Sequence, residues 1–110
     1  MKKVEELFDI MFPGDFEKVY SNSNVEFKEF IKLENEEILP NVYVDSYEVE
    51  HGNCRPAYGF VIKSGDKTLG NSGDSRLCDA IEQIVEKSDV SILEMSFIED
   101  GGIAHMSLND

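Results

Sequence analysis

The sequence predicts an α+β protein in which a mixed β-sheet packs against helices. Residues 42–49 and 57–64 are rich in β-branched and aromatic side chains, which favour strands. Residues 76–87 carry apolar side chains at helical spacing, and a nearly continuous apolar run follows at 89–95. A strand, a crossover helix and a second strand predict a parallel strand pair. A length of 110 residues predicts a single domain over residues 1–110.

The first part of the chain predicts a helix and a strand. Residues 4–11 place apolar side chains at i, i+3, i+4 and i+7, and Pro13-Gly14 ends this helix. Residues 25–33 begin with the alternation of apolar and charged side chains that is typical of a strand. The segment "ENEEILP" at 34–40 is expected to be a loop.

The middle of the chain predicts two strands and a hairpin. Residues 51–56, "HGNCRP", are expected to form an irregular link between the strands at 42–49 and 57–64. Gly65-Asp66 is a hairpin turn that leads into residues 67–72.

The helix at 76–87 has a clear start and a buried face. Asp74 or Ser75 is expected to cap its N-terminus through a side-chain oxygen, and Lys87 suits its last turn. The buried face is expected to contain Leu77, Ile81, Ile84 and Val85. The strand at 89–95 is expected to be covered on both faces, and so to be central in the sheet. Residues 99–110 are expected to form a loop.

The composition excludes several classes of protein. With 23 acidic against 10 basic residues, the net charge of -13 repels phosphate backbones, which predicts no nucleic-acid binding. Cys54 and Cys78 form no CxxC pair, so neither a zinc ribbon nor a disulfide scaffold is expected. Acidic residues interrupt the N-terminal apolar segment, which excludes a signal peptide, and no apolar run is long enough to span a membrane. We therefore expect a cytoplasmic protein.

Four stretches in order carry a resemblance to a known family. "VYVDSYEVEHGNCRPAYGFVI", "KTLGNSGDS", "DVSILEMSF" and "AHMSLND" resemble the later part of a metallo-β-lactamase-fold hydrolase, with ribonuclease Z-like proteins closest in pattern. The order and spacing agree over roughly residues 42–110, and "ELFDIMFPGD" is similar to the helix that precedes this region in the family. The resemblance implies a partial αββα sandwich.

The resemblance also implies a set of site residues. His51 matches a metal-binding histidine before the "YG" strand, and Asp74 in "SGDS" matches the aspartate that bridges two metals. Glu94 matches the acidic residue at the end of the strand, where Leu93 replaces a frequent histidine. His105 matches the histidine of an H-x-S/T loop that assists proton transfer at the leaving group. The implied cofactor is zinc or another divalent metal, which suits imidazole and carboxylate ligands.

Each of these residues also has an ordinary structural interpretation. His51 is interpretable as a polar loop residue and Asp74 as a helix cap. Glu94 is interpretable as a solvated strand end, and His105 as part of a disordered C-terminus.

The family's first metal motif, H-x-H-x-D-H, is absent, because the sequence holds only two histidines. The final metal-binding histidine at the end of a later strand is absent as well. Three interpretations stay open: a hydrolase subunit completed by a complementary metallo-β-lactamase half, a non-catalytic interaction module or remnant, and a homodimer that assembles a site of its own. The acidic surface favours a small phosphoester or ester as substrate. An uncovered apolar sheet face would contain residues such as Val42, Val44, Phe60, Ile62, Ile92 and Phe97, and it predicts association.

Overall fold

The structure is a computed structural model that describes residues 6–7, 10–11, 13–14, 32–100 and 102–110. The chain divides into two units, Met1–Ile31 and Lys32–Asp110, which are described separately. In the first unit, residues 6, 7, 10 and 11 are helical, in agreement with the helix predicted at 4–11. The strand predicted at 25–33 lies outside the described residues except for its last two positions, which are not in a strand.

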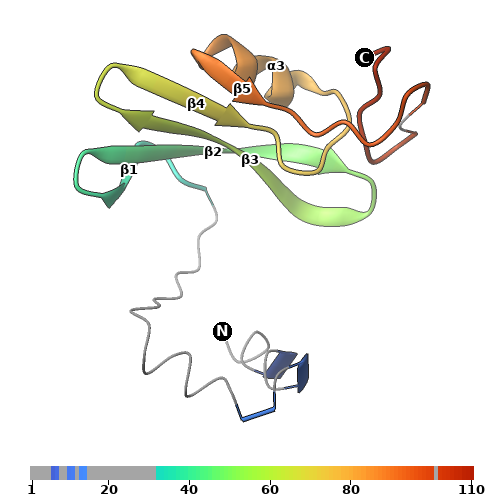
Figure 1. Cartoon of the computed structure of the whole chain (residues 1–110), viewed down its shortest axis with the longest axis horizontal. Helices are drawn as coiled ribbons and strands as arrows, with labels where there is room; N and C mark the ends of the chain where they lie inside the picture. The colour runs from blue at the N-terminus through green and yellow to red at the C-terminus, as the bar shows by residue number, and fades with distance from the viewer. Residues whose placement is uncertain (1–5, 8–9, 12, 15–31, 101) are drawn as a thin grey trace. The chain divides into compact units, whose positions relative to one another are not determined.

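The second unit contains a mixed five-stranded sheet with the strand order β1-β2-β3-β4-β5 (Figure 1). The first four strands form an antiparallel meander, and β5 pairs parallel with β4. The strands are β1 (Glu36–Leu39), β2 (Val42–His51), β3 (Cys54–Ser64), β4 (Lys67–Asn71) and β5 (Val90–Ile92). The α+β class and the parallel pairing across the helix are therefore confirmed.

Two segments expected to be irregular are strands instead. Residues 36–39 form β1, which pairs with β2 through a turn where Asn41 has a φ of 62°. The segment at 51–56 is a hairpin, because β2 continues to His51 and β3 starts at Cys54. Gly52 takes a φ of 53° in this turn, a conformation that favours glycine.

Helix α3 (Asp79–Glu86) covers one face of the sheet, but it starts later than the sequence predicts. Its N-cap is Cys78, which makes no side-chain capping hydrogen bond, so a cap at Asp74 or Ser75 is wrong. The Ser75 hydroxyl is buried, 2.7 Å from the Arg76 carbonyl oxygen and 3.2 Å from that of Glu50. The hydroxyl is therefore held at the end of β2, and it lies 3.9 Å from the sulfur of Cys78 without capping the helix.

Strand β5 is an exposed edge of the sheet in the part of the chain that the structure describes. The prediction of a central strand at 89–95 is therefore wrong, and the strand is shorter, at Val90–Ile92. Val90 is 61% exposed and Ile92 is 55% exposed. A continuous apolar run is typical of a strand covered on both faces, but an exposed apolar strand at the edge of a sheet has the same sequence pattern.

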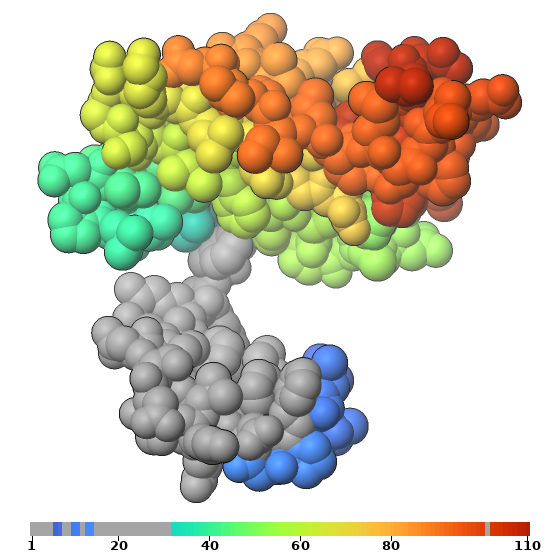
Figure 2. Space-filling view, in the orientation of Figure 1, coloured from blue at the N-terminus to red at the C-terminus, as the bar shows by residue number. Residues whose placement is uncertain are grey.

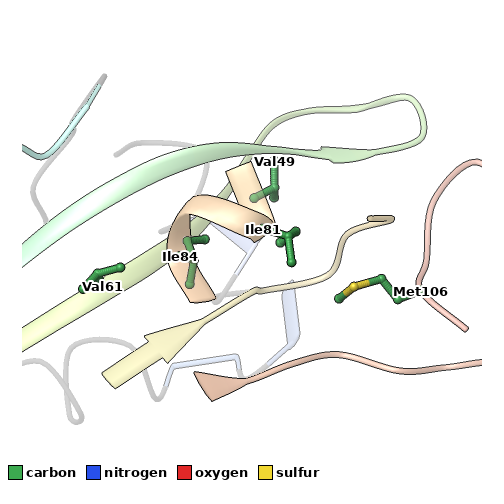
Figure 3. Close-up of a cluster of buried hydrophobic side chains, with 5 residues drawn as sticks. All are labelled: Val49, Val61, Ile81, Ile84 and Met106. Atoms are coloured by element: carbon green, nitrogen blue, oxygen red, sulfur yellow. The ribbon is translucent and has the colours of Figure 1, made fainter. Parts of the chain in front are cut away.

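The core lies between α3 and the face of the sheet that it covers. Its buried side chains are Val49, Val61, Ile81, Ile84 and Met106 (Figure 3). The helix sits close to the strands because glycines leave room for it: a Cβ at Gly59 would meet Ile84 Cδ1 at 2.6 Å, and one at Gly70 would meet Ile84 Cγ2 at 2.8 Å. Val85, expected on this buried face, is 42% exposed. Among the described residues, no helix is long and apolar enough to cross a membrane.

We expect Ile84→Ala to lower the free energy of unfolding by about 3 kcal/mol, because it leaves a cavity at the fully buried centre of this core. The matched control is Val85→Ala on the exposed side of the same helix, which should change it by less than about 0.5 kcal/mol. Chemical denaturation followed by circular dichroism measures both. Equal losses in the two variants would contradict the assignment of the buried face.

Candidate functional site

Three of the five strands have their carboxyl ends on the same side of the sheet, at the end where the strands terminate. Strand β2 is antiparallel to β3, and β3 is antiparallel to β4, so β2 and β4 point the same way, as does β5. His51 is the last residue of β2, Asp74 follows the end of β4, and Glu94 follows the end of β5. The meander therefore brings these three sequence positions to one edge.

Ser72 links the loop after β4 to the segment after β5. Its backbone N–H donates to the Ile92 carbonyl oxygen at 3.1 Å, and its hydroxyl accepts from the Glu94 N–H at 2.8 Å. The same hydroxyl donates to the Gly73 carbonyl oxygen at 2.7 Å. This buried serine therefore uses its hydroxyl as donor and acceptor together, and fixes where the Glu94 backbone leaves the sheet.

Asp74 lies in a loop that is attached to the end of β2. The Arg76 N–H donates to the Glu50 carbonyl oxygen at 2.8 Å, and the Arg76 side chain lies 3.2 Å from the Glu50 carboxylate. Glu50 directly precedes His51, so the loop runs beside the end of the strand that carries this histidine. The Asp74 side chain itself is exposed.

The C-terminal segment, residues 102–110, folds back over this edge of the sheet (Figure 1). The Gly52 N–H donates to the Ile103 carbonyl oxygen at 3.2 Å, and Phe97 forms an isolated parallel bridge with Ser107. Met106 enters the core, at 4% exposure. The segment is therefore ordered against the body of the unit, and the interpretation of His105 as part of a disordered terminus does not apply.

Glu94 is the centre of the hydrogen bonds that hold this segment. Its side chain is only 13% exposed, and its carboxylate accepts from the Met106 N–H at 3.1 Å, from His105 Nδ1 at 3.1 Å and from the Ser96 hydroxyl. Burial raises the pKa of Glu94, but the hydrogen bonds from Ser96, the Met106 N–H and His105 outweigh it and hold the pKa below its usual value. Glu94 is therefore an ionised, inward-facing carboxylate, not a solvated strand end.

The two histidines of the sequence lie against each other. Their ring centroids are 4.8 Å apart in an edge-to-face arrangement, and the Phe97 ring lies 5.9 Å from that of His105. His51 Nδ1 lies 3.0 Å from the Ala104 carbonyl oxygen, which only accepts, so Nδ1 carries the proton. The Glu94 carboxylate assigns the proton of His105 to Nδ1 in the same way. In each neutral ring Nε2 is then left with a free lone pair.

These hydrogen bonds are of the kind that metal-binding histidines make, since the ring nitrogen that does not bind the metal usually donates to a backbone carbonyl or a carboxylate. The number of ligands does not match, however. No group of three or more His, Cys, Asp or Glu side chains that could hold a metal ion occurs among the residues that the structure describes. A zinc site needs at least three protein ligands. The described residues therefore do not form a complete metal site.

The structure thus brings together His51, Glu94 and His105 from the predicted set, and places the loop of Asp74 next to the end of β2. Sequence reasoning missed Ser72 and Ser96, whose hydroxyls bond Glu94. A serine is too common to be singled out by type, but both lie within two residues of a predicted site residue. Their position next to predicted site residues is the feature of the sequence that could have identified them.

No family model matches the chain, and no curated protein matches its sequence. Among solved structures, it is similar to the metallo-beta-lactamase fold protein YhfI from Bacillus subtilis, with a TM-score of 0.56 and 18% sequence identity. The match covers 86% of this chain and 40% of YhfI, so this chain spans about two fifths of the length of that protein. At this identity the likeness shows the fold alone. The chain is an α+β protein whose fold resembles part of a metallo-β-lactamase fold.

We expect both imidazoles to be in the Nδ1–H tautomer once they are neutral. Long-range ¹H–¹⁵N correlation spectra recorded above about pH 8 distinguish the tautomers, because protonated and unprotonated ring nitrogens differ strongly in chemical shift. An Nε2–H tautomer for His105 would contradict its hydrogen bond to Glu94, and one for His51 would contradict its bond to Ala104.

We expect Glu94→Gln to lower the free energy of unfolding by about 1 to 2 kcal/mol at pH 7, because an amide cannot replace the charge-assisted hydrogen bonds. The folded-state pKa of Glu94 lies below the unfolded value, so its contribution is complete above the unfolded pKa and is lost as the pH falls through the folded one.

The difference between wild type and Glu94→Gln should therefore shrink below about pH 4. Glu36→Gln on the exposed strand β1 is the control, with little effect at either pH. Urea titrations at several pH values measure both variants. A Glu94→Gln difference that grows on acidification would show that the sign is wrong.

Proposed function

We propose that this chain is a subunit or fragment of a metal-dependent hydrolase of the metallo-β-lactamase superfamily, of the ribonuclease Z-like type, and that it is inactive alone. The observation that carries the proposal is the linked set Glu94–His105–His51, in which His105 of the C-terminal segment meets residues at the carboxyl ends of β2 and β5. The fold likeness to YhfI supports the proposal. The motif resemblance supports it as well, because these three residues lie in the stretches that resemble the superfamily.

The roles of the residues follow from their hydrogen bonds. Glu94 holds His105 by its Nδ1–H, which leaves Nε2 of His105 as the atom that would exchange a proton with a leaving group. His51 offers the Nε2 lone pair of a ring whose Nδ1–H is held by Ala104, and we assign it and Asp74 as metal ligands.

The remaining ligands come from a complementary polypeptide that carries a histidine-rich loop, because the described residues alone lack a three-ligand group. The cation is zinc or another divalent metal by resemblance. We place the reaction in the cytoplasm and its substrate among small phosphoesters or esters, because a net charge of -13 repels a long phosphate backbone.

A non-catalytic interaction module is the second candidate. One observation favours it: apolar side chains of β5 and of the segment after it are exposed, as they are on a surface that binds another protein. Metal affinity distinguishes the two candidates, because a hydrolase subunit binds a metal through His51 once its partner is present, whereas an interaction module binds none.

The test is co-expression of this chain with the product of a neighbouring gene that encodes a histidine-rich metallo-β-lactamase half. The proposal predicts a complex that binds Zn²⁺ and hydrolyses bis(p-nitrophenyl) phosphate, while this chain alone does neither. His105→Ala should lower the kcat of the complex by roughly a hundredfold or more with Zn²⁺ still bound, whereas His51→Ala should lose Zn²⁺. Glu82→Gln, on the exposed side of α3, is the control and should leave both unchanged.

Tight Zn²⁺ binding or turnover by the isolated chain would contradict the claim that its site is incomplete. A complex that binds no Zn²⁺ and has no activity would favour the interaction module.

A further inference from the structure

The two edges of the sheet differ in charge. Strand β1, at one edge, has the sequence EEIL, and its acidic Glu36 and Glu37 discourage pairing with another strand. Strand β5, at the other edge, has the sequence VSI with no charged residue. An uncharged, exposed edge is the kind that pairs with a further strand. In the part of the sheet that the structure describes, the β5 edge is therefore the one that is open to association.

The uncharged edge continues into an exposed apolar segment. We name residues 90–98 the β5 strip; it is open on the face shown in Figure 2, in orange. Its exposed apolar side chains are Val90 (61%), Ile92 (55%), Leu93 (41%), Met95 (52%), Phe97 (47%) and Ile98 (75%). Soluble monomers rarely leave so many neighbouring apolar side chains exposed.

The backbone of β5 shows how a further strand would bond to it. The Ile92 carbonyl oxygen accepts from the Ser72 N–H, so the polar backbone groups of Ile92 face β4. Backbone groups alternate in direction along a strand, so those of Ser91 face the open edge. Ser91 therefore offers one N–H and one C=O to a neighbouring strand, which is what one residue of a hydrogen-bonded antiparallel pair needs.

We propose that β5 pairs antiparallel with β5 of a second copy of this chain, about a two-fold axis at Ser91. This arrangement is self-complementary: each Ser91 exchanges both of its backbone hydrogen bonds with its counterpart, and Val90 of each copy lies opposite Ile92 of the other. A second copy suits this edge because the sequence reads apolar–serine–apolar in both directions.

The two acidic side chains nearest to β5 along the chain, those of Asp89 and Glu94, are held by hydrogen bonds within the chain. The Asp89 carboxylate accepts from the N–H of Thr68 at 2.8 Å and from its hydroxyl at 3.1 Å, which holds it toward β4. The Glu94 carboxylate is turned inward to His105 and Met106. The net charge of -13 on each copy acts over longer distances, and salt screens it beyond about 8 Å at physiological ionic strength.

Sedimentation velocity of the purified chain, from low to high micromolar concentrations, tests the proposal. We expect a monomer–dimer equilibrium that tightens when the salt concentration is raised from about 0.02 M to about 0.15 M. Ser91→Pro removes the N–H donor at the axis, and Val90→Lys sets a charge opposite Ile92. Each should weaken dimerisation at least about tenfold.

The matched control is Leu39→Lys, at a residue of the β1 edge that is 62% exposed, which should change the dissociation constant less than about twofold. Circular dichroism verifies that each variant is folded. If Ser91→Pro does not fold, the comparison of Val90→Lys with the control tests the proposal. A chain that stays monomeric throughout overturns the proposal, whether or not another polypeptide binds the strip. The proposal is also overturned if Leu39→Lys weakens the dimer as much as Val90→Lys does.

Discussion

The arrangement of the candidate site depends on the hydrogen bonds to the partly buried carboxylate of Glu94. It accepts hydrogen bonds from a hydroxyl two residues along, from a backbone N–H of the C-terminal segment and from a histidine ring. A carboxylate that is largely removed from water is destabilising without such partners, so the segments that provide them are held in place. The C-terminal segment provides two of them and is therefore held over the edge of the sheet, where His105 meets His51.

The fold places Glu94 there through the direction of its strands. An antiparallel meander returns every second strand to the same edge, and the helical crossover after β4 adds β5 in the parallel sense. Glycines at positions 59 and 70 let α3 approach the sheet closely, which fixes the crossover on one face. The site is thus a consequence of topology first and of individual side chains second. The same topology leaves β5 at an open edge of the described sheet. The candidate site and the β5 strip are therefore next to each other and share Glu94.

Sequence reasoning found the long central strands and the parallel pairing because β-branched and apolar patterns are local. It misplaced the helix cap because the Ser75 hydroxyl is held near a carbonyl oxygen of Glu50, a contact across 25 positions that no local pattern reveals. It took the apolar run after the helix for a central strand, since apolar content does not say whether a neighbour is present. It named His51, Asp74, Glu94 and His105 from ordered motifs. Asp74 is the one whose side chain is exposed, and an exposed loop carboxylate has no packing that reveals its role.

Glu94 holds the C-terminal segment over the sheet, so that the two imidazole rings are in contact. Nuclear Overhauser effects between the ring protons of His51 and His105 measure this directly, because they report only protons within roughly the separation of rings in contact. We expect strong effects between the rings in the wild-type chain, and their loss in Glu94→Ala while the effects among the core side chains of α3 and β3 persist. Wild-type spectra without any effect between the two rings, in a chain that otherwise shows this core, would contradict it.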